Sequence, residues 1–137
     1  MEISKSSPVI ERAHLPKDLL GYYDAERHVV VVAHGLTAAQ RRAVIAHELE
    51  HARHGDRPCL DPILHARRER ATERASSRRL ITLDALVDAL LWCRDEQEMA
   101  WHLHVDTIAV RARLDGLTDE EKDQIARRIA VTEEGVA

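Results

Sequence analysis

Residues 44–56, VIAHELEHARHGD, place two histidines four positions apart, with a glutamate directly after the first. Successive residues of a helix turn by about 100°, so His47 and His51 point the same way, one turn apart. Two imidazoles placed in this way can share one zinc ion, with Glu48 beside them. A catalytic zinc lowers the pKa of a bound water to about 7, and Glu48 could take that proton during attack on a carbonyl. The spacing predicts a catalytic metal site.

The same five-residue pattern also fits a solvated helix that carries histidines by chance, because the chain contains nine of them. Glu50, Arg53 and Asp56 are expected to lie on the exposed surface of this helix. The motif is short, so its structural setting has to support the metal-site interpretation.

The helix that carries the motif is predicted over about residues 38–54. Residues 37–40, TAAQ, form a capping box in which Thr37 and Gln40 satisfy each other's backbone. Arg53 and His54 occupy the last turn, where positive charge suits the helix dipole, and Gly55 ends the helix. The motif therefore lies in the second half of a helix, as its chemistry requires.

A third metal ligand can come from a second helix, predicted over about residues 63–80. Glu69 and Glu73 share a face, and two like charges at this spacing destabilise a helix unless a positive charge lies opposite. A metal ion with its histidines would supply that charge. We predict Glu69 as the third ligand and Glu73 as the hydrogen-bond acceptor of a ligating histidine. The alternative is that both acids pair with the six arginines of residues 67–79 on an exposed helix.

Four other side chains are weaker candidates for the site. His65 precedes Glu69 by one helical turn and is an alternative ligand. His54 lies on the same side as the motif histidines, although a charge at the helix end explains it. Tyr22 and Tyr23 alternate along a predicted strand, where one could stabilise an oxyanion or both could pack.

The elements that position these residues predict an α+β fold. Residues 1–15 resemble a loose lead-in, and residues 19–24 and 28–35 predict a β-hairpin. After the two long helices, residues 83–92 form a short apolar helix. Residues 95–130 predict three short helices, broken near residues 105–106 and at Gly116, with Thr118 capping the last. We expect a domain over residues 1–94, with a helical tail over 95–137 packed on it.

The composition indicates a soluble, cytoplasmic protein with reduced thiols. The 137 residues are 45% apolar and 32% charged, with a net charge of −4, which argues against a protein that mainly binds nucleic acid or an anionic membrane. Cys59 and Cys93 lie far apart and form no CxxC pair, so reduced thiols are favoured over the alternative of a single disulfide. We do not expect secretion by a signal peptide, because residues 1–18 contain no apolar core, and the longest strongly apolar stretch, residues 29–33, is far too short to cross a membrane.

Residues 98–117 have the spacing of a helix-turn-helix unit, whose second helix would offer Arg111 and Arg113 to DNA. Acidic residues surround these arginines: Asp95, Glu96, Glu98, Asp106 and Asp115. Such a local charge is the opposite of a phosphate-binding surface. A packing unit or a protein-docking surface is therefore favoured over contact with DNA.

The sequence also resembles the ImmA/IrrE-type metallopeptidases, which are zincins of bacteria, phages and integrative elements. The resemblance covers about residues 14–115 and rests on LTAAQRRAVIAHELEHARHGD and ERATERASSRRLI. It implies a zincin-like fold with a small sheet, an active-site helix and a ligand helix. It also implies that His47, His51 and Glu69 bind zinc and that Glu48 is the general base of an endopeptidase. The implied substrate is a DNA-binding repressor of a phage or mobile element.

This chain departs from the family pattern at four positions. Glu50 stands where a small residue is usual, Thr72 and Glu73 replace the common Ala-Asp/Asn, and Ala75 replaces an aromatic residue. Glu73 and His65 therefore remain alternatives to Glu69 as the third ligand. Two other functions also stay open. One is a non-catalytic, zinc-stabilised regulator that binds DNA or a repressor through its C-terminal helices, and the other is a toxin–antitoxin component.

Overall fold

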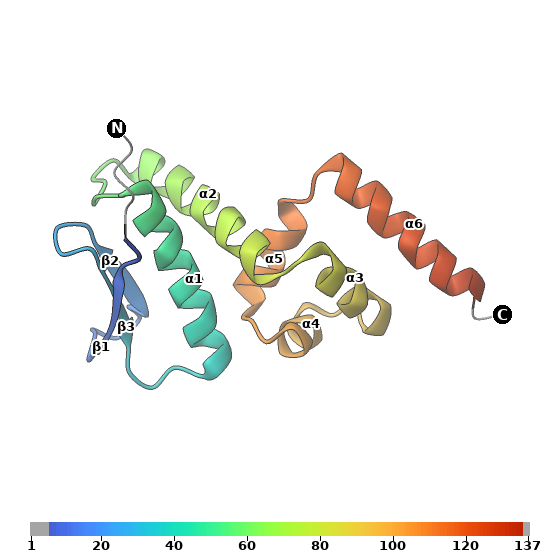
Figure 1. The fold of residues 1–137 in the computed structure, drawn as a ribbon, viewed down its shortest axis with the longest axis horizontal. Coiled ribbons are helices and arrows are strands. Elements are labelled where there is room, and N and C mark those ends of the chain that lie inside the picture. Colours follow the sequence, from blue (N-terminus) through green and yellow to red (C-terminus); the bar gives the residue numbers. More distant parts are fainter. Residues whose placement is uncertain (1–5, 136–137) are drawn as a thin grey trace.

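The computed structural model describes residues 6–135, which form three strands and six helices (Figure 1). The strands are β1 (Val9–Ala13), β2 (Gly21–Asp24) and β3 (Val29–Ala33). The helices are α1 (Ala38–His54), α2 (Pro62–Leu80), α3 (Leu83–Trp92), α4 (Glu96–Leu103), α5 (Thr107–Asp115) and α6 (Asp119–Gly135). The predicted α+β class is confirmed. The breaks predicted near residues 105–106 and at Gly116 lie between α4 and α5 and between α5 and α6.

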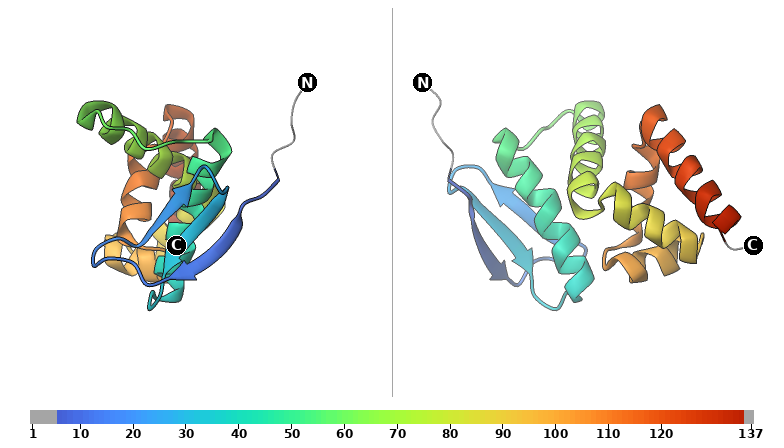
Figure 2. Two further views of the ribbon diagram at one scale, coloured as in Figure 1. Left: turned by 90° about the vertical axis from the view of Figure 1, so that its left-hand side faces the viewer. Right: turned by 45° about the vertical axis from the view of Figure 1, so that its right-hand side comes forward.

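The small sheet has the order β1-β3-β2, with β3 in the centre. Its four valines, residues 29–32, are all buried, as suits a central strand of β-branched residues. β2 pairs with β3 antiparallel, which confirms the predicted hairpin, with strands shorter than the predicted segments. The sheet lies against one side of α1 (Figure 2).

The prediction of a loose lead-in over residues 1–15 is wrong for residues 9–13, which form β1 and pair with β3 in parallel. Four of the five residues of β1 are exposed, so the strand has no buried face to give an alternating pattern. Its partner lies 20 positions later in the chain, and local sequence patterns do not report such a pairing. Residues 1–5 lie outside the described residues.

The predicted limits of α1 are confirmed by its end contacts. Thr37 and Gln40 form the capping box, and Gly55 adopts the left-handed conformation, with a φ of 62°. At the sheet, a Cβ on Gly21 would lie 2.6 Å from Cγ1 of Val44 and 2.9 Å from the carbonyl oxygen of Val31. The absence of a side chain at Gly21 therefore allows α1 to approach β2 closely.

Helix α2 packs between α1 and α5 along a face of small polar residues. Asp61 caps its N-terminus by accepting hydrogen bonds from two backbone amides. Thr72, Ser76 and Ser77 are buried, and both serine hydroxyls donate to carbonyl oxygens of the preceding turn. These short side chains let the helices approach while their polar atoms stay paired.

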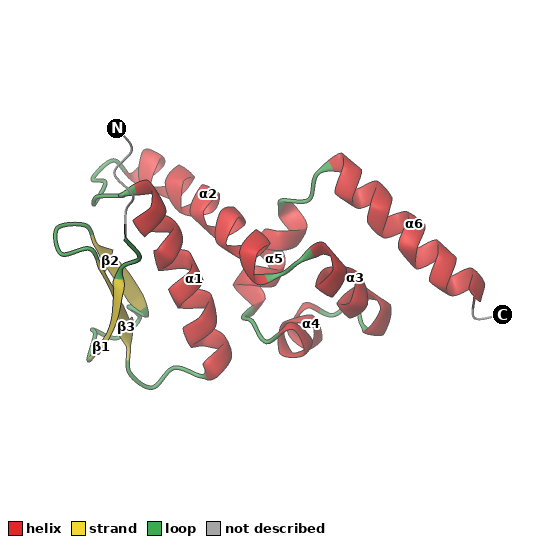
Figure 3. Ribbon diagram, viewed as in Figure 1, coloured by secondary structure: helices red, strands yellow, loops and turns green. Residues whose placement is uncertain are grey.

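A cluster of buried apolar residues lies among α3, α4, α5 and α6. These helices lie away from the sheet (Figure 3). The cluster includes Leu86 of α3, Met99 of α4 and Val110 of α5. Its members come from both sides of residue 95, and the expected division into a domain and a tail stays a prediction. None of the described helices is both long enough and apolar enough to span a membrane.

Arg113 of α5 is part of this packed region rather than of an exposed surface that could face DNA. The residue is only 2% exposed. Its Nε donates to the carbonyl oxygen of Ile81 at 2.8 Å, and a terminal nitrogen donates to Glu121 at 3.0 Å. On the same helix, Arg111 pairs with Glu96. Contacts inside the protein therefore occupy both arginines.

Candidate metal centre

The facing sides of α1 and α2, which lie next to each other in Figures 1 and 2, bring the predicted ligands together. His47 and His51 are one turn apart on α1, and their ring centroids are 4.9 Å apart. Glu69 reaches them from α2. One ligand atom from each of these three residues lies within 4.8 Å of the others, which makes them a group that could hold a metal ion.

Each oxygen of the Glu69 carboxylate contacts the Nε2 atom of one of the two histidine rings. Its Oε2 lies 2.9 Å from Nε2 of His47, and its Oε1 lies 2.9 Å from Nε2 of His51. Two imidazole nitrogens and a carboxylate are a donor set that zinc accepts, and three protein ligands leave a fourth coordination position open. The residues present therefore fit a zinc ion.

The opposite nitrogen of each ring contacts a second carboxylate. Nδ1 of His47 lies 2.6 Å from Glu73, and Nδ1 of His51 lies 2.8 Å from Asp56. An Nδ1–H that donates to a carboxylate fixes the tautomer in which Nε2 keeps its lone pair for a metal. Neither Glu69 nor Glu73 forms an ion pair with an arginine within residues 6–135, so the alternative of an arginine-paired surface is not what the structure shows.

Asp56 was expected to be a surface residue, and that expectation was wrong, because its side chain is only 18% exposed and contacts His51. The turn after α1 accounts for this contact. With Gly55 left-handed, the amide of Asp56 donates to the carbonyl oxygen of His51 at 3.0 Å, and that of Gly55 donates to Ala52. This is the Schellman pattern, which returns the residue after the glycine to the last turn of the helix. The signal was present in the sequence as a glycine at the predicted helix end.

Glu50 was also expected on the outward face of α1, and this expectation was wrong, because Glu50 is only 4% exposed. Its carboxylate accepts hydrogen bonds from Arg53 at 2.9 Å and from Arg79 of α2 at 3.1 Å. His54 also contacts it, at 3.2 Å, and the His54 side chain is 61% exposed. Glu50 therefore links α1 to α2, and His54 lies outside the ligand group.

The carboxylates around the histidines favour a positive charge at this point. Burial lowers the pKa of His47, but the hydrogen bond to Glu73 and the negative charges of Glu73, Glu48 and Glu69 outweigh it. The pKa of His47 consequently rises to about 9. The electrostatic field that holds a proton on this ring equally favours a divalent cation, which would replace the proton.

Burial also raises the pKa of the Glu48 carboxyl above its usual value, against the opposing effect of His47 and His51. A carboxylate with a raised pKa is a better proton acceptor near neutral pH than an exposed one. Glu48 shares an open cavity of about 270 Å³ with His51 and Glu69. Its position beside the ligands, rather than among them, suits a base.

The wall of this cavity carries the weaker candidates. Tyr22 and Tyr23 of β2 and His65 of α2 line it, together with Arg57 and Arg68. His65 is exposed and does not belong to the ligand group. The structure thus places His65 where it can contact a bound molecule, and it favours Glu69 over His65 as the partner of the two histidines.

A protein-family model for the M78 peptidases, described as the IrrE N-terminal-like domain, matches residues 8–137. A search of curated proteins and a search of solved structures found no match. The family match confirms the resemblance seen in the sequence and extends it beyond residue 115.

Proposed function

We propose that this chain, which belongs to the M78 peptidase family of IrrE N-terminal-like domains, is a zinc-dependent endopeptidase. The family indicates a metallopeptidase in general terms. The observation that carries the finer proposal is the convergence of two Nε2 atoms on both oxygens of Glu69. Glu48 borders the same cavity.

In this proposal His47, His51 and Glu69 hold the zinc ion. Bound zinc supplies Lewis acidity, which activates water and polarises a carbonyl group. Glu73 and Asp56 orient the two rings by accepting their Nδ1 protons, so that both Nε2 lone pairs stay available.

Glu48 is the proposed general base. Its carboxylate would accept a proton as water attacks the peptide carbonyl and would return it to the departing amine. Its raised pKa supports both steps, because the group must gain and then lose a proton near neutral pH. Tyr22 and His65 line the same cavity and are available to contact the substrate, whereas the hydroxyl of Tyr23 contacts Nδ1 of His28 at 2.7 Å.

The substrate we propose is a protein, and more narrowly a DNA-binding repressor of a phage or mobile element. The family supports a protein substrate in general, and the sequence resemblance supports the repressor. Both cysteines are free thiols, which fits the cytoplasmic location we propose.

Substitution of Glu48 by Gln tests this function most directly. The amide keeps the size of the side chain but cannot accept the proton. We therefore expect Glu48→Gln to retain the zinc content of the wild type, measured by metal analysis, while cleavage of a co-expressed repressor is lost. Cleavage at the wild-type rate would overturn the role of Glu48, and absence of zinc from the wild type would overturn the metal centre.

The competing proposal of a regulator that binds DNA through α5 has less support from the structure. Arg113 is buried and Arg111 is paired with Glu96, so few free cations remain on this helix for phosphate. Salt-sensitive binding of duplex DNA by the Glu48→Gln protein, with no proteolysis by the wild type, would favour the regulator.

A further inference from the structure

Both tryptophans of the chain are exposed, and neither lines the cavity of the candidate metal centre. Trp92, at the end of α3, is 76% exposed, and Trp101, on α4, is 84% exposed. They border a cavity of about 560 Å³, named here the tryptophan cleft, which is lined by Trp92, Cys93, Asp95, Gln97, Glu98, Trp101 and His102. Tryptophan is enriched among the residues that contribute most to protein–protein binding. Two exposed indoles beside one cleft mark a candidate interaction surface.

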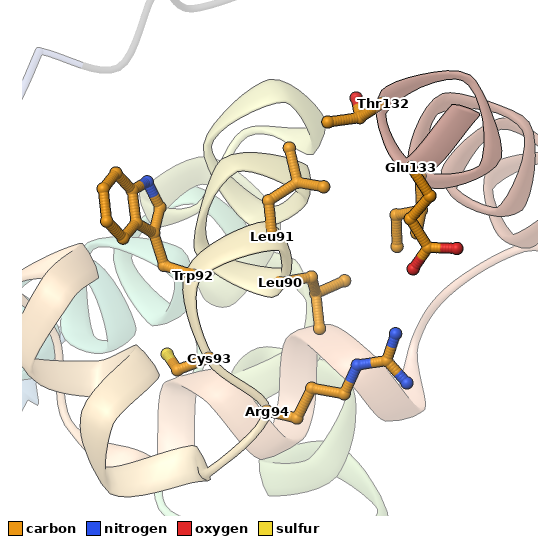
Figure 4. A pocket seen from close by; sticks show the side chains of 8 residues that line it. Leu90, Leu91, Trp92, Cys93, Arg94, Thr132 and Glu133 are labelled. Atoms are coloured by element: carbon orange, nitrogen blue, oxygen red, sulfur yellow. The ribbon is translucent and has the colours of Figure 1, made fainter. Parts of the chain in front are cut away.

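A second hollow adjoins the cleft on the other side of α3. This groove has a volume of about 550 Å³ and lies between α3 and α6. Figure 4 shows Leu90 and Leu91 on the α6 side of α3, whereas the indole of Trp92 points away from Thr132 and Glu133. Trp92 and Cys93 line both hollows. The groove, which Arg94, Thr132 and Glu133 line beside its aliphatic residues, and the aromatic cleft therefore form one continuous surface.

The tryptophan cleft is acidic. Asp95 and Glu98 line it, and the described residues that line it include no lysine or arginine, whereas Arg94 lines the adjoining groove. The ring of His102 contacts Asp88 at 3.0 Å. Burial, followed by the negative charges of Glu98 and Asp95, raises the pKa of the Cys93 thiol. The wall and the floor of the cleft therefore favour a cation over an anion.

This charge argues against several occupants. Acidic side chains repel the phosphates of nucleic acid and of anionic lipid surfaces. In a symmetric dimer the same acidic cleft would face itself, with like charges opposed. A contact between the cleft of one copy and the arginines of α2 on another would join two different surfaces, and such contacts grow into open chains unless they close into a ring.

We propose that the tryptophan cleft docks a segment of another protein that presents a lysine or arginine flanked by aliphatic side chains. The cation would lie over an indole face, where the ring attracts it, with Asp95 and Glu98 as counter-charges. The flanking aliphatic side chains would occupy the groove of Leu90 and Leu91. This surface contains none of the proposed metal ligands, so the inference stands whether or not the chain is a peptidase.

The test uses the full chain with Glu48→Gln, which prevents cleavage of the probe. The probe is a helical peptide of leucine and arginine without tryptophan, and its control carries glutamate in place of arginine. Because the only two tryptophans border the cleft, their fluorescence reports its occupancy, and calorimetry gives the affinity. We expect saturable binding of the arginine peptide that weakens with added salt. Trp101→Ala and Glu98→Lys should each weaken it by about tenfold.

Leu60→Ala is the matched control, because Leu60 is 96% exposed and lies outside the cleft. This variant should bind the arginine peptide as the wild type does. Equal binding of the glutamate peptide would overturn the proposal, as would an unchanged affinity in Trp101→Ala. Fluorescence changes with anionic vesicles, or a dimer that Trp101→Ala dissociates in sedimentation, would assign the surface to a membrane or to a second copy instead.

Discussion

Removal of the Asp56 carboxylate should weaken metal binding although Asp56 is not itself a proposed ligand. Oδ2 of Asp56 lies 2.8 Å from Nδ1 of His51 and holds that ring with Nε2 toward the metal centre. Loss of such a partner typically lowers metal affinity by about 10- to 100-fold, which corresponds to about 1.4–2.8 kcal/mol.

The surroundings of Asp56 place the two possible substitutions at different points of this range. The His51 side chain is only 9% exposed, so water replaces the lost acceptor poorly, and Arg68, whose Nε lies 4.0 Å from Asp56, would lose this ion pair. We expect Asp56→Ala to weaken zinc binding by about 100-fold. Asp56→Asn keeps a carbonyl oxygen as acceptor, and since charge-assisted bonds are about twice as strong as neutral ones, about tenfold is expected.

Competition between the metal-free protein and a chromophoric zinc chelator measures these affinities. The matched control is Asp61→Ala, because the Asp61 side chain caps α2 by accepting from the amides of Ile63 and Leu64 and does not contact His47 or His51. Asp61→Ala should lower the free energy of unfolding by about 0.5–2 kcal/mol and leave zinc affinity unchanged. Zinc binding by Asp56→Ala that equals the wild type would refute the role of Asp56 in orienting His51.

Three further substitutions test the packing of the fold. Gly21→Ala should lower the free energy of unfolding in urea by about 1–3 kcal/mol, because its Cβ would meet a methyl group of α1 at 2.6 Å, whereas Gly135→Ala, with open space around it, should not. Arg113→Met should cost about 1–3 kcal/mol, because the carbonyl of Ile81 and the carboxylate of Glu121 lose a donor, and a gel-shift assay should show no change in DNA binding. Hydrogen bonds from arginines of α2 and α5 hold the pKa of Glu121 well below its usual value of 4.5, so its ionised form stabilises the fold above that pH. This contribution to stability is lost as the pH falls. The free energy of unfolding of Glu121→Gln should therefore decrease less with falling pH than that of the wild type, and an equally steep decrease would contradict the pairing.

The sequence predicted those parts of the site that depend on contacts within one helix. The pairing of His47 with His51 and the capping box at Thr37 follow from spacings of three and four residues. The predicted limits of α1 matched the structure for the same reason. Contacts made between elements were harder to predict. β1 pairs with a strand 20 residues away, and the burial of Glu50 depends on Arg79 of a different helix.

The burial of Glu50 also explains why a departure from the family pattern is compatible with the fold. A carboxylate in place of a small residue on α1 would be costly if it were buried alone. Here two arginines contact it, one from the last turn of α1 and one from α2. The added charge therefore ties together the two helices that carry the proposed ligands. Since Arg53 and Arg79 are about half exposed, they retain much of their hydration while they neutralise Glu50.

The departure at Glu73 has a comparable explanation in the reach of its side chain. The sequence resemblance implies Asp or Asn at this position, whose side chain is one methylene shorter than that of Glu. From α2, the longer side chain brings Oε2 to 2.6 Å from Nδ1 of His47, the nitrogen that faces away from Glu69. A charged acceptor there orients the ring more strongly than an amide would. The same contact would be out of reach if α2 were displaced, so the small buried residues Thr72 and Ser76, which let α2 pack closely, are also a condition for the metal centre.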